Sequence, residues 1–311
     1  MRVFVAGATG VLGRASVREL IAAGHEVRGA SRSEANDEVL REFGATPAMT
    51  DLFHAASVRE AVGDSEAVCH LATKIPSLMR MRRTSAWKEN NRLRREGTRH
   101  LVDAALAANA QVFVQESISF IYGDHGDNWI SEDAPLEPSW PVALDSTIDM
   151  EREAGRFAGD GLRTVVLRFG LFYGPDAQST IDSARLARRR MLPVIGRGDN
   201  YFSSVHVKDA ARAVVAALDA PGGIYNVCED EPSTQAQYAA AFTAAIGAPK
   251  PWRVPRWLGK LVLGGPSRYI LQSQRVSNRK FNEATGWAPV YPSVRDGFAQ
   301  VAAELRKGGA K

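Results

Sequence analysis

Cysteine is scarce in this sequence, and long hydrophobic runs are missing. Only Cys69 and Cys228 occur among the 311 residues, each in an apolar run typical of a strand. Such a pair predicts buried, reduced thiols rather than a disulfide framework. No apolar run reaches the roughly 18 residues of a membrane span, and no charged-plus-apolar leader precedes the first apolar run at residue 2. We therefore expect a soluble, cytoplasmic protein without a membrane partner.

Two patterns associated with catalysis are also missing. No group of His, Cys and carboxylate residues has the spacing of a zinc site, so we expect no metal. No G-x-S-x-G sequence marks a hydrolase-type nucleophile. At 311 residues and 45% hydrophobic content, the chain can still bury a large core in one or two domains.

Glycine, by contrast, is concentrated near the beginning of the chain, in GATGVLG over residues 7–13. A β-branched and apolar run precedes it at 2–6, and apolar residues at helical spacing follow. Glycines at a strand-to-helix junction allow a tight turn, close approach of the backbone to a pyrophosphate, and close packing of helix on strand. The helix N-terminus adds free N–H groups for the phosphates. The turn predicts a dinucleotide site.

The rest of the chain alternates between two kinds of pattern. Apolar runs at 2–6, 25–30, 66–72, 111–118 and 163–169 alternate with helical patterns near 11–23, 55–62, 84–109 and 146–160. This alternation predicts an α/β fold with a doubly wound parallel sheet of the Rossmann type. SSVHVKD (203–209) and GGIYNVCED (222–230) are predicted to be strands that return to the first domain.

Several further segments resemble one family. Together with the glycine turn, they are similar in order and spacing to segments of the extended short-chain dehydrogenases/reductases, the NAD(P)-dependent epimerase/dehydratase family. The segments are VCHLAT (68–73), EGTRHLVDAA (96–105), SISFIYG (117–123), VVLRFGLFYGP (165–175), VHVKDAARAV (205–214) and YNVCEDEPST (225–234). The resemblance runs nearly end to end. It implies a small-molecule substrate, leaves a homodimer open, and places an adenine-contacting Asp at Asp51, next to Leu52.

The predicted coenzyme is NADP(H). An NAD-preferring site needs an acidic residue at the end of the second strand, and this chain has Ser31 followed by Arg32. A guanidinium fits a 2′-phosphate, and Arg14 offers a second contact. The full set of expected coenzyme contacts is Gly7, Thr9, Gly10, Val11, Leu12, Gly13, Arg14, Arg32, Asp51, Leu52, Leu71, Ala72 and Thr73. We expect an NADP-binding domain over 1–174 with 202–228, and a smaller substrate-binding lid over 175–201 with 229–311.

Positive charge is unevenly distributed. The net charge is +4, yet residues 71–100 hold nine Lys and Arg against two Glu. No nucleic-acid recognition motif accompanies them, so we expect no nucleic-acid partner. A solvated helix face is the favoured interpretation, with a channel for an acidic ligand or for coenzyme phosphates as the alternative.

The catalyst usual in the resembled family is absent. It combines a Ser or Thr with a Tyr and a Lys four residues apart on one helix, where the lysine lowers the pKa of the tyrosine. No tyrosine in this chain is followed by a lysine at that spacing. Alignment on Glu151 puts Ala143 and Thr147 in the two positions, and alignment on the YG pair at 122–123 puts Ile118 in the position of the Ser or Thr.

Other residues are therefore candidates for the chemistry. Lys74, expected to be partly desolvated near the nicotinamide, and Asp145, expected to face the cleft, are proposed as acid/base groups, although a solvated loop lysine and a helix-start acid are the alternatives. Ser119 and Tyr173 complete the catalytic candidates. Apolar side chains at positions that are polar in nucleotide-sugar enzymes suggest a fairly apolar substrate. The expected substrate contacts are Met79, Ile118, Trp140, Leu171, Phe172 and Phe202.

Three functions fit these features. The first is an NADP(H)-dependent oxidoreductase that acts on a small, fairly apolar carbonyl or hydroxyl compound through non-standard acid/base residues. The second is a redox-neutral isomerase, dehydratase or cyclase on the same fold. The third is a redox sensor that binds NADP without turnover. Only analogy to the family's fold favours an enzyme over a sensor.

Overall fold

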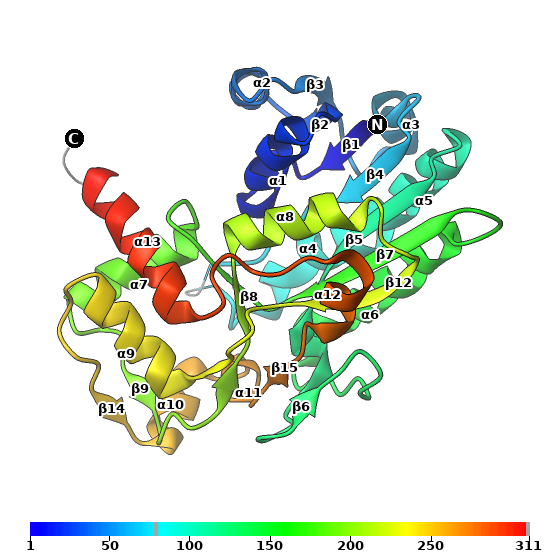
Figure 1. The fold of residues 1–311 in the computed structure, drawn as a ribbon. Helices are drawn as coiled ribbons and strands as arrows, with labels where there is room; N and C mark the ends of the chain where they lie inside the picture. Colours follow the sequence, from blue (N-terminus) through cyan, green and yellow to red (C-terminus); the bar gives the residue numbers. More distant parts are fainter. Residues whose placement is uncertain (78–79, 309–311) are drawn as a thin grey trace.

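A computed structural model describes residues 1–77 and 80–308 of the protein. Its centre is a seven-stranded parallel sheet with the strand order β12-β7-β5-β4-β1-β2-β3 (Figure 1). The chain runs outward from β1 in one direction and from β4 in the other, so the topology switches between these two strands. This confirms the predicted Rossmann-type, doubly wound sheet. The strands are β1 (Arg2–Ala6), β2 (Glu26–Ser31), β3 (Thr46–Met49), β4 (Ala67–His70), β5 (Val112–Ile118), β7 (Arg163–Phe169) and β12 (Gly223–Val227).

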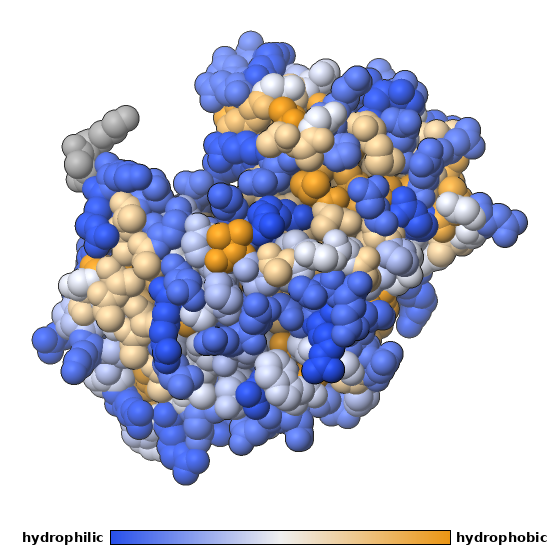
Figure 2. Space-filling view, in the orientation of Figure 1, coloured by the Kyte–Doolittle hydropathy of each residue, from blue (hydrophilic) through white to orange (hydrophobic). Residues whose placement is uncertain are grey.

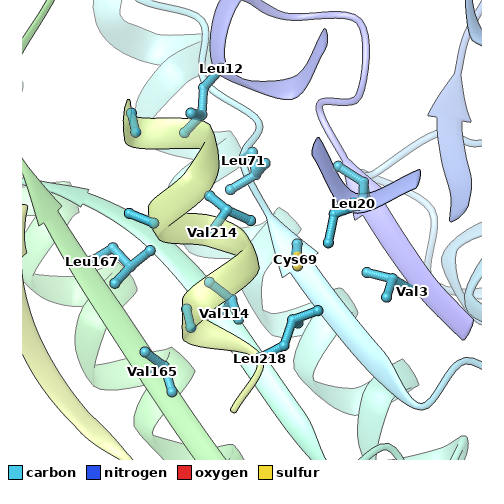
Figure 3. Close-up of a cluster of buried hydrophobic side chains, with 14 of the residues drawn as sticks. Val3, Leu12, Leu20, Cys69, Leu71, Val114, Val165, Leu167, Val214 and Leu218 are labelled. Atoms are coloured by element: carbon cyan, nitrogen blue, oxygen red, sulfur yellow. The ribbon is translucent and has the colours of Figure 1, made fainter. Parts of the chain in front are cut away.

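The sheet is apolar on both faces because helices cover both. In β1, Val3 and Val5 join one buried cluster, whereas Phe4 and Ala6 join the other. Helices α1 (Val11–Ala22), α2 (Glu34–Glu42) and α8 (Val207–Ala217) contribute to the first cluster, in which α8 packs along the sheet (Figure 3). Helices α3 (Ala55–Val62), α5 (Thr98–Ala107) and α6 (Pro141–Ala154) cover the opposite face.

The predicted helix over 84–109 is one nearly continuous rod with an irregularity in the middle. It consists of the 3₁₀ turn η1 (Thr84–Trp87), α4 (Lys88–Arg92), the π-helical turn η2 (Leu93–Gly97) and α5. A π-turn inserts an extra residue into a helix and is frequent at functional sites. Here it lies against α6, beside the carboxyl end of the sheet.

The remaining elements build the C-terminal part and its connections. The described residues form four two-stranded pairs: β6 (Trp129–Ile130) with β15 (Arg275–Val276), β8 (Leu171–Tyr173) with β11 (Ser204–His206), β9 (Val194–Ile195) with β14 (Arg253–Val254), and β10 (Tyr201–Phe202) with β13 (Ser233–Thr234). The other helices and turns are η3 (Ser119–Tyr122), η4 (Gly155–Phe157), α7 (Gln178–Arg188), α9 (Gln235–Ala245), α10 (Arg256–Leu263), α11 (Ser267–Ile270), α12 (Arg279–Thr285) and α13 (Val294–Gly308).

The two later strands pair with elements of the first 174 residues, as predicted. β12 lies beside β7 in the central sheet, and β11 pairs with β8 outside that sheet. The strand predicted over 203–209 needs one correction, since it ends at His206, where the ring of this residue accepts a hydrogen bond from the amide of Lys208 and caps α8. Within the C-terminal part, α12 packs on β12, so Phe281 and Trp287 belong to the cluster around the main sheet.

The two cysteines are buried and unbonded, as predicted, and burial raises the pKa of the Cys69 thiol to about 12. Over residues 1–77 and 80–308, no helix is both long and apolar enough to cross a bilayer, and no three His, Cys or carboxylate residues group as metal ligands. The surface in Figure 2 is largely hydrophilic, with several smaller hydrophobic patches. One of these lies between α9 and α13, where alanines of both helices line a groove.

Candidate active site

The glycine turn joins β1 to α1 and forms a backbone cradle. Gly7 has a φ of +81°, and a Cβ at this residue would lie 2.6 Å from Cα of Ala72. A Cβ on Gly13 would overlap the carbonyl of Gly7. In front of Gly10 the space is open, since a Cβ there would meet just the Gly7 oxygen, at 3.2 Å. The backbone is closely packed at Gly7 and Gly13, and space is open at Gly10. This arrangement fits a pyrophosphate at the start of α1.

The other predicted coenzyme residues lie at the same edge of the sheet. Parallel strands place their carboxyl ends together, so Arg32 after β2, Asp51 after β3 and Leu71 after β4 are neighbours of the turn. Arg32 is exposed, and Oδ1 of Asp51 accepts a hydrogen bond from the amide of Phe53 at 2.9 Å. Leu12 and Leu71 point their side chains into the core (Figure 3), which leaves their backbone for the coenzyme.

A buried ion pair fixes the position of α6. The guanidinium of Arg168 on β7 contacts both carboxylate oxygens of Glu151, at 2.6 and 2.9 Å, and the hydroxyl of Ser117 donates to the same carboxylate. Residues four apart share a helix face, so Ala143, Thr147 and Glu151 point in one direction. Ala143 and Thr147 are 1% and 0% exposed. This buried face therefore presents a methyl group and a hydroxyl group.

An aromatic cluster lies beside Ala143. Trp87 and Trp140 meet edge to face with ring centroids 5.2 Å apart, and Phe120 and Tyr269 pack at 4.4 Å. Tyr269 comes from α11, so the C-terminal part completes a cluster that the first 174 residues begin. The predicted substrate residues Ile118, Trp140 and Leu171 all belong to it.

Phe172 and Phe202 lie elsewhere. Phe172 packs on Phe169 of the main core, at 5.1 Å between ring centroids. Phe202 contacts the ring of Tyr238, on α9. Met79 lies outside the described residues. Of the predicted substrate contacts, three are therefore brought together and two are kept apart from them.

Two catalytic candidates have a different environment from the one expected. Lys74 is 55% exposed, and its ammonium pairs with Glu89 at 2.6 Å, so it is not the desolvated lysine predicted. Asp145 lies on the exposed side of α6, because the neighbouring positions 143, 144, 146 and 147 form the buried side. Its carboxylate is therefore exposed to solvent.

The other two candidates are both buried, in separate places. Ser119 begins η3, beside α6, and its hydroxyl has no hydrogen-bond partner among the described residues. Tyr173 packs against His206 and Phe298 in the cluster around α13, where burial raises its pKa. Its hydroxyl points at Gly297, so Tyr173 serves packing between β8 and α13 rather than the face of α6 that carries Ala143.

Sequence reasoning missed Arg94. This residue lies in the π-turn η2 and is 1% exposed, whereas Arg92 and Arg95 beside it make surface ion pairs. Its Nη1 donates to the carbonyl of Ala143 at 2.9 Å and to Oγ of Ser146 at 3.4 Å. A signal existed in the sequence: Asn90, Arg94, Thr98 and Leu101 recur at helical spacing. It was hidden by the other charges of the segment.

The groups that interact electrostatically with Arg94 are neutral near pH 7. Burial, opposed by Arg94, raises the pKa of Glu116 on β5 to about 8. Burial and the charge of Arg94 lower the pKa of His70 to about 3, and burial raises that of Tyr269 to about 12. Burial lowers the pKa of Arg94 itself to about 10. The face of α6 without a lysine therefore does have a buried cation beside it.

Residues 3–228 match the model of the NAD dependent epimerase/dehydratase family. A Streptomyces protein, 3-diazoavenalumate denitrifying reductase, is 36% identical over 96% of this chain and 100% of its own length. The 2-alkyl-3-oxoalkanoate reductase of Shewanella oneidensis is 28% identical over 83% of this chain and 70% of its own.

Solved structures agree with the fold. The human epimerase family protein SDR39U1, crystallised with NADPH, superposes with a TM-score of 0.83 at 25% identity, over 97% of this chain and 99% of its own. The match to the family and the reductase relatives indicate an enzyme of the short-chain dehydrogenase/reductase kind with an NAD(P)-dependent, oxidoreductase-like role. On this evidence the chain belongs to the NAD dependent epimerase/dehydratase family.

Proposed function

We propose that this protein is an NADPH-dependent reductase that replaces the diazo group of an aromatic compound by hydrogen and releases dinitrogen. One observation carries the proposal: the buried face of α6 has Ala143 and Thr147 where a proton-transferring pair is usual. The reaction proposed is one for which such a pair is dispensable. The name and full-length similarity of the Streptomyces reductase support the same chemistry.

The proton balance separates this reaction from carbonyl reduction. A hydride added to a carbonyl carbon leaves an alkoxide, which a nearby acid must protonate. Replacement of an aryl diazonium group takes up one hydride, forms a C–H bond, and expels N₂ with the electron pair of the C–N bond. The balanced reaction consumes no proton. NADPH, when bound, supplies the hydride.

The residues of this chain have two tasks in the proposal. The cradle at Gly7 and Gly10 binds the pyrophosphate and so fixes the coenzyme at the carboxyl edge of the sheet. The rings of Trp140 and Tyr269 hold a planar aromatic substrate and exclude water. We assign 1–174 with 202–228 to coenzyme binding and 175–201 with 229–311 to the substrate lid, which contributes Tyr269.

The preference for NADPH over NADH is part of the proposal. Ser31 ends β2 without a carboxylate, and its hydroxyl donates to the carbonyl of Ser33 at 3.1 Å. Arg32 is exposed at the same edge and is free to meet a 2′-phosphate. We expect Arg32→Ala to weaken NADPH binding by roughly ten- to a hundredfold, the loss of a charge-assisted contact, and to leave NADH binding unchanged. Calorimetric titration of both nucleotides measures this, and equal losses for the two would contradict it.

A ketoreductase is the second candidate. The buried, unpartnered hydroxyl of Ser119 favours it, because a hydroxyl beside the site can donate to a carbonyl oxygen. The name of the Shewanella relative points the same way. In this case Ser119 would act without Lys74 and Asp145, which lie at the surface.

Isotope-labelled coenzyme tests the proposal. With stereospecifically deuterated NADPH and an aryl diazonium acid, we expect one N₂ released per NADPH oxidised and one deuterium on the ring carbon. Because diazonium ions also oxidise nicotinamides unaided, a Gly10→Val protein serves as the matched background. Reduction of a carbonyl panel with no diazo reduction would favour the ketoreductase. Turnover without NADPH consumption would favour a redox-neutral enzyme, and tight NADPH binding without any turnover would favour a sensor.

A further inference from the structure

We propose that Arg94 binds the carboxylate of the substrate, so that the ligands of the aromatic cluster are planar aromatic acids. The aromatic part of this ligand rests on the function proposed above, whereas the acidic group is inferred from the surroundings of Arg94. The residue lies under α6 at the position of Ala143, directly beside the aromatic cluster.

The position of the guanidinium is fixed at one end only. Nη1 is held by the carbonyl of Ala143 and by Ser146, whose hydroxyl in turn contacts Oδ1 of Asn91 at 2.9 Å. Nε of Arg94 is buried and has no hydrogen-bond partner in the described part of the chain. Hydrogen bonds therefore hold the Nη1 side of the guanidinium, and the N–H of Nε remains available to donate to a ligand.

The charge of Arg94 is not compensated. Its neighbours Arg92, Arg95 and Arg99 pair with carboxylates at the surface, whereas no ion pair involves Arg94 within residues 1–77 and 80–308. Glu116 is the carboxyl group that acts on it electrostatically, and this group is largely protonated at neutral pH. A buried cation without an ionised partner is costly to keep, and ionisable groups with strongly shifted pKa values cluster at functional sites. An anionic ligand would compensate the charge of Arg94.

Further buried polar groups lie on α6 and on the elements that contact it. They include three side-chain atoms that are buried without hydrogen-bond partners among the described residues: Asn90 Nδ2 on α4, Ser119 Oγ on η3 and Thr147 Oγ1 on α6. The elements α4, η2 and η3 all contact α6, so these atoms come from one region of the fold. Buried polar atoms are rarely left unpaired, and a ligand with several acceptor oxygens would satisfy donors of this kind.

The cluster determines the rest of the ligand. Trp87, Trp140, Phe120 and Tyr269 present ring faces and edges, which pack best on another flat, apolar group. Since Arg94 is 1% exposed, a bound carboxylate would be shielded from water, and the charged contact would be stronger than at the surface. An aromatic acid meets both requirements.

The matched ligands cinnamate and cinnamamide test this inference on the protein saturated with NADP⁺. They share the planar apolar part and differ in charge. We expect cinnamate to bind roughly ten- to a hundredfold more tightly than the amide, as for a gained charge-assisted contact. In Arg94→Met the two affinities should become equal while cinnamamide binding is retained. Arg94→Lys should keep part of the preference, and Arg92→Met, an exposed arginine two residues away, should keep all of it.

A pH series on the unmodified protein gives an independent readout if Arg94→Met does not fold. Of the groups that interact with Arg94, Glu116 on β5 is the one that titrates between pH 6.5 and 9, because His70 on β4 and Tyr269 on α11 stay neutral there. As Glu116 ionises near pH 8 it opposes a bound carboxylate, so the preference for cinnamate should fall several-fold. In Glu116→Gln the preference should not change with pH.

Either of two results would overturn the inference. One is equal binding of cinnamate and cinnamamide by the unmodified protein. The other is a preference that Arg94→Met leaves intact, or, if that variant does not fold, one that stays constant from pH 6.5 to 9. Neither ligand carries a diazo group or is reduced in this assay. The outcome is therefore independent of whether the protein reduces diazo compounds.

Discussion

Gly10→Val is expected to abolish tight NADPH binding while the protein stays folded. The valine side chain would project into the open space in front of the cradle, where the pyrophosphate must approach the amides at the start of α1. Loss of two charge-assisted hydrogen bonds corresponds to a weakening of about a hundredfold to ten-thousandfold. Nucleotide titration by fluorescence or calorimetry measures the effect.

The fold should tolerate this change. Gly10 has a φ of −73°, which any residue adopts, and its Cβ position touches just the Gly7 oxygen, at 3.2 Å. Gly159→Val is a matched control, because a Cβ at Gly159 has nothing within 4 Å. Its loop precedes β7, at the amino end of the sheet, whereas the glycine turn follows the carboxyl end of β1. Normal NADPH affinity in Gly10→Val would mean that the turn has a structural role alone.

Arg168→Met is expected to cause the largest loss of stability. The substitution leaves the carboxylate of Glu151 buried without its partner and removes the donor to the hydroxyl of Tyr122, which itself donates to Asn226 on β12. Breaking a buried ion pair on one side typically costs about 3–5 kcal/mol. The network joins α6, β5, β7 and β12, so the loss should appear in the global unfolding transition. Urea denaturation at pH 7 measures it.

Arg156→Met provides the comparison. Arg156 also pairs with two carboxylates, Glu153 and Asp103, but its side chain is 47% exposed. Solvent screens such a pair, and we expect a change in the free energy of unfolding of no more than about 1 kcal/mol. If the two variants lost the same free energy of unfolding, burial would not be the reason for the large contribution of the Glu151–Arg168 pair to stability.

Some features of this protein follow from the sequence because they depend on short-range spacing. The glycine turn at 7–13 requires particular residues at particular backbone positions, and strand and helix periodicities are local. The central sheet and the turn between β1 and α1 were therefore predictable. The common face of Ala143, Thr147 and Glu151 was equally predictable, since the three residues lie four apart on one helix.

Other features were decided by tertiary packing. Helical spacing alone cannot say which side of α6 is covered, and the packing of this helix on η2 and β5 turned Asp145 to solvent. Lys74 forms an ion pair with a carboxylate at the surface, and Tyr173 packs against α13, which lies far along the chain. Such outcomes depend on neighbours that are distant in sequence.

The same reason explains why Arg94 was overlooked. In the sequence it is one of nine basic residues between 71 and 100, which together are typical of a solvated surface. The π-turn and the contact with Ala143 separate it from Arg92 and Arg95 and bury it beside Tyr269, from a segment 175 positions later. The sequence by itself determined the doubly wound fold and the glycine turn between β1 and α1. Long-range packing decided which cation is buried beside the face of α6 that carries Ala143 and Thr147, because burial of a charge depends on what the rest of the chain places around it.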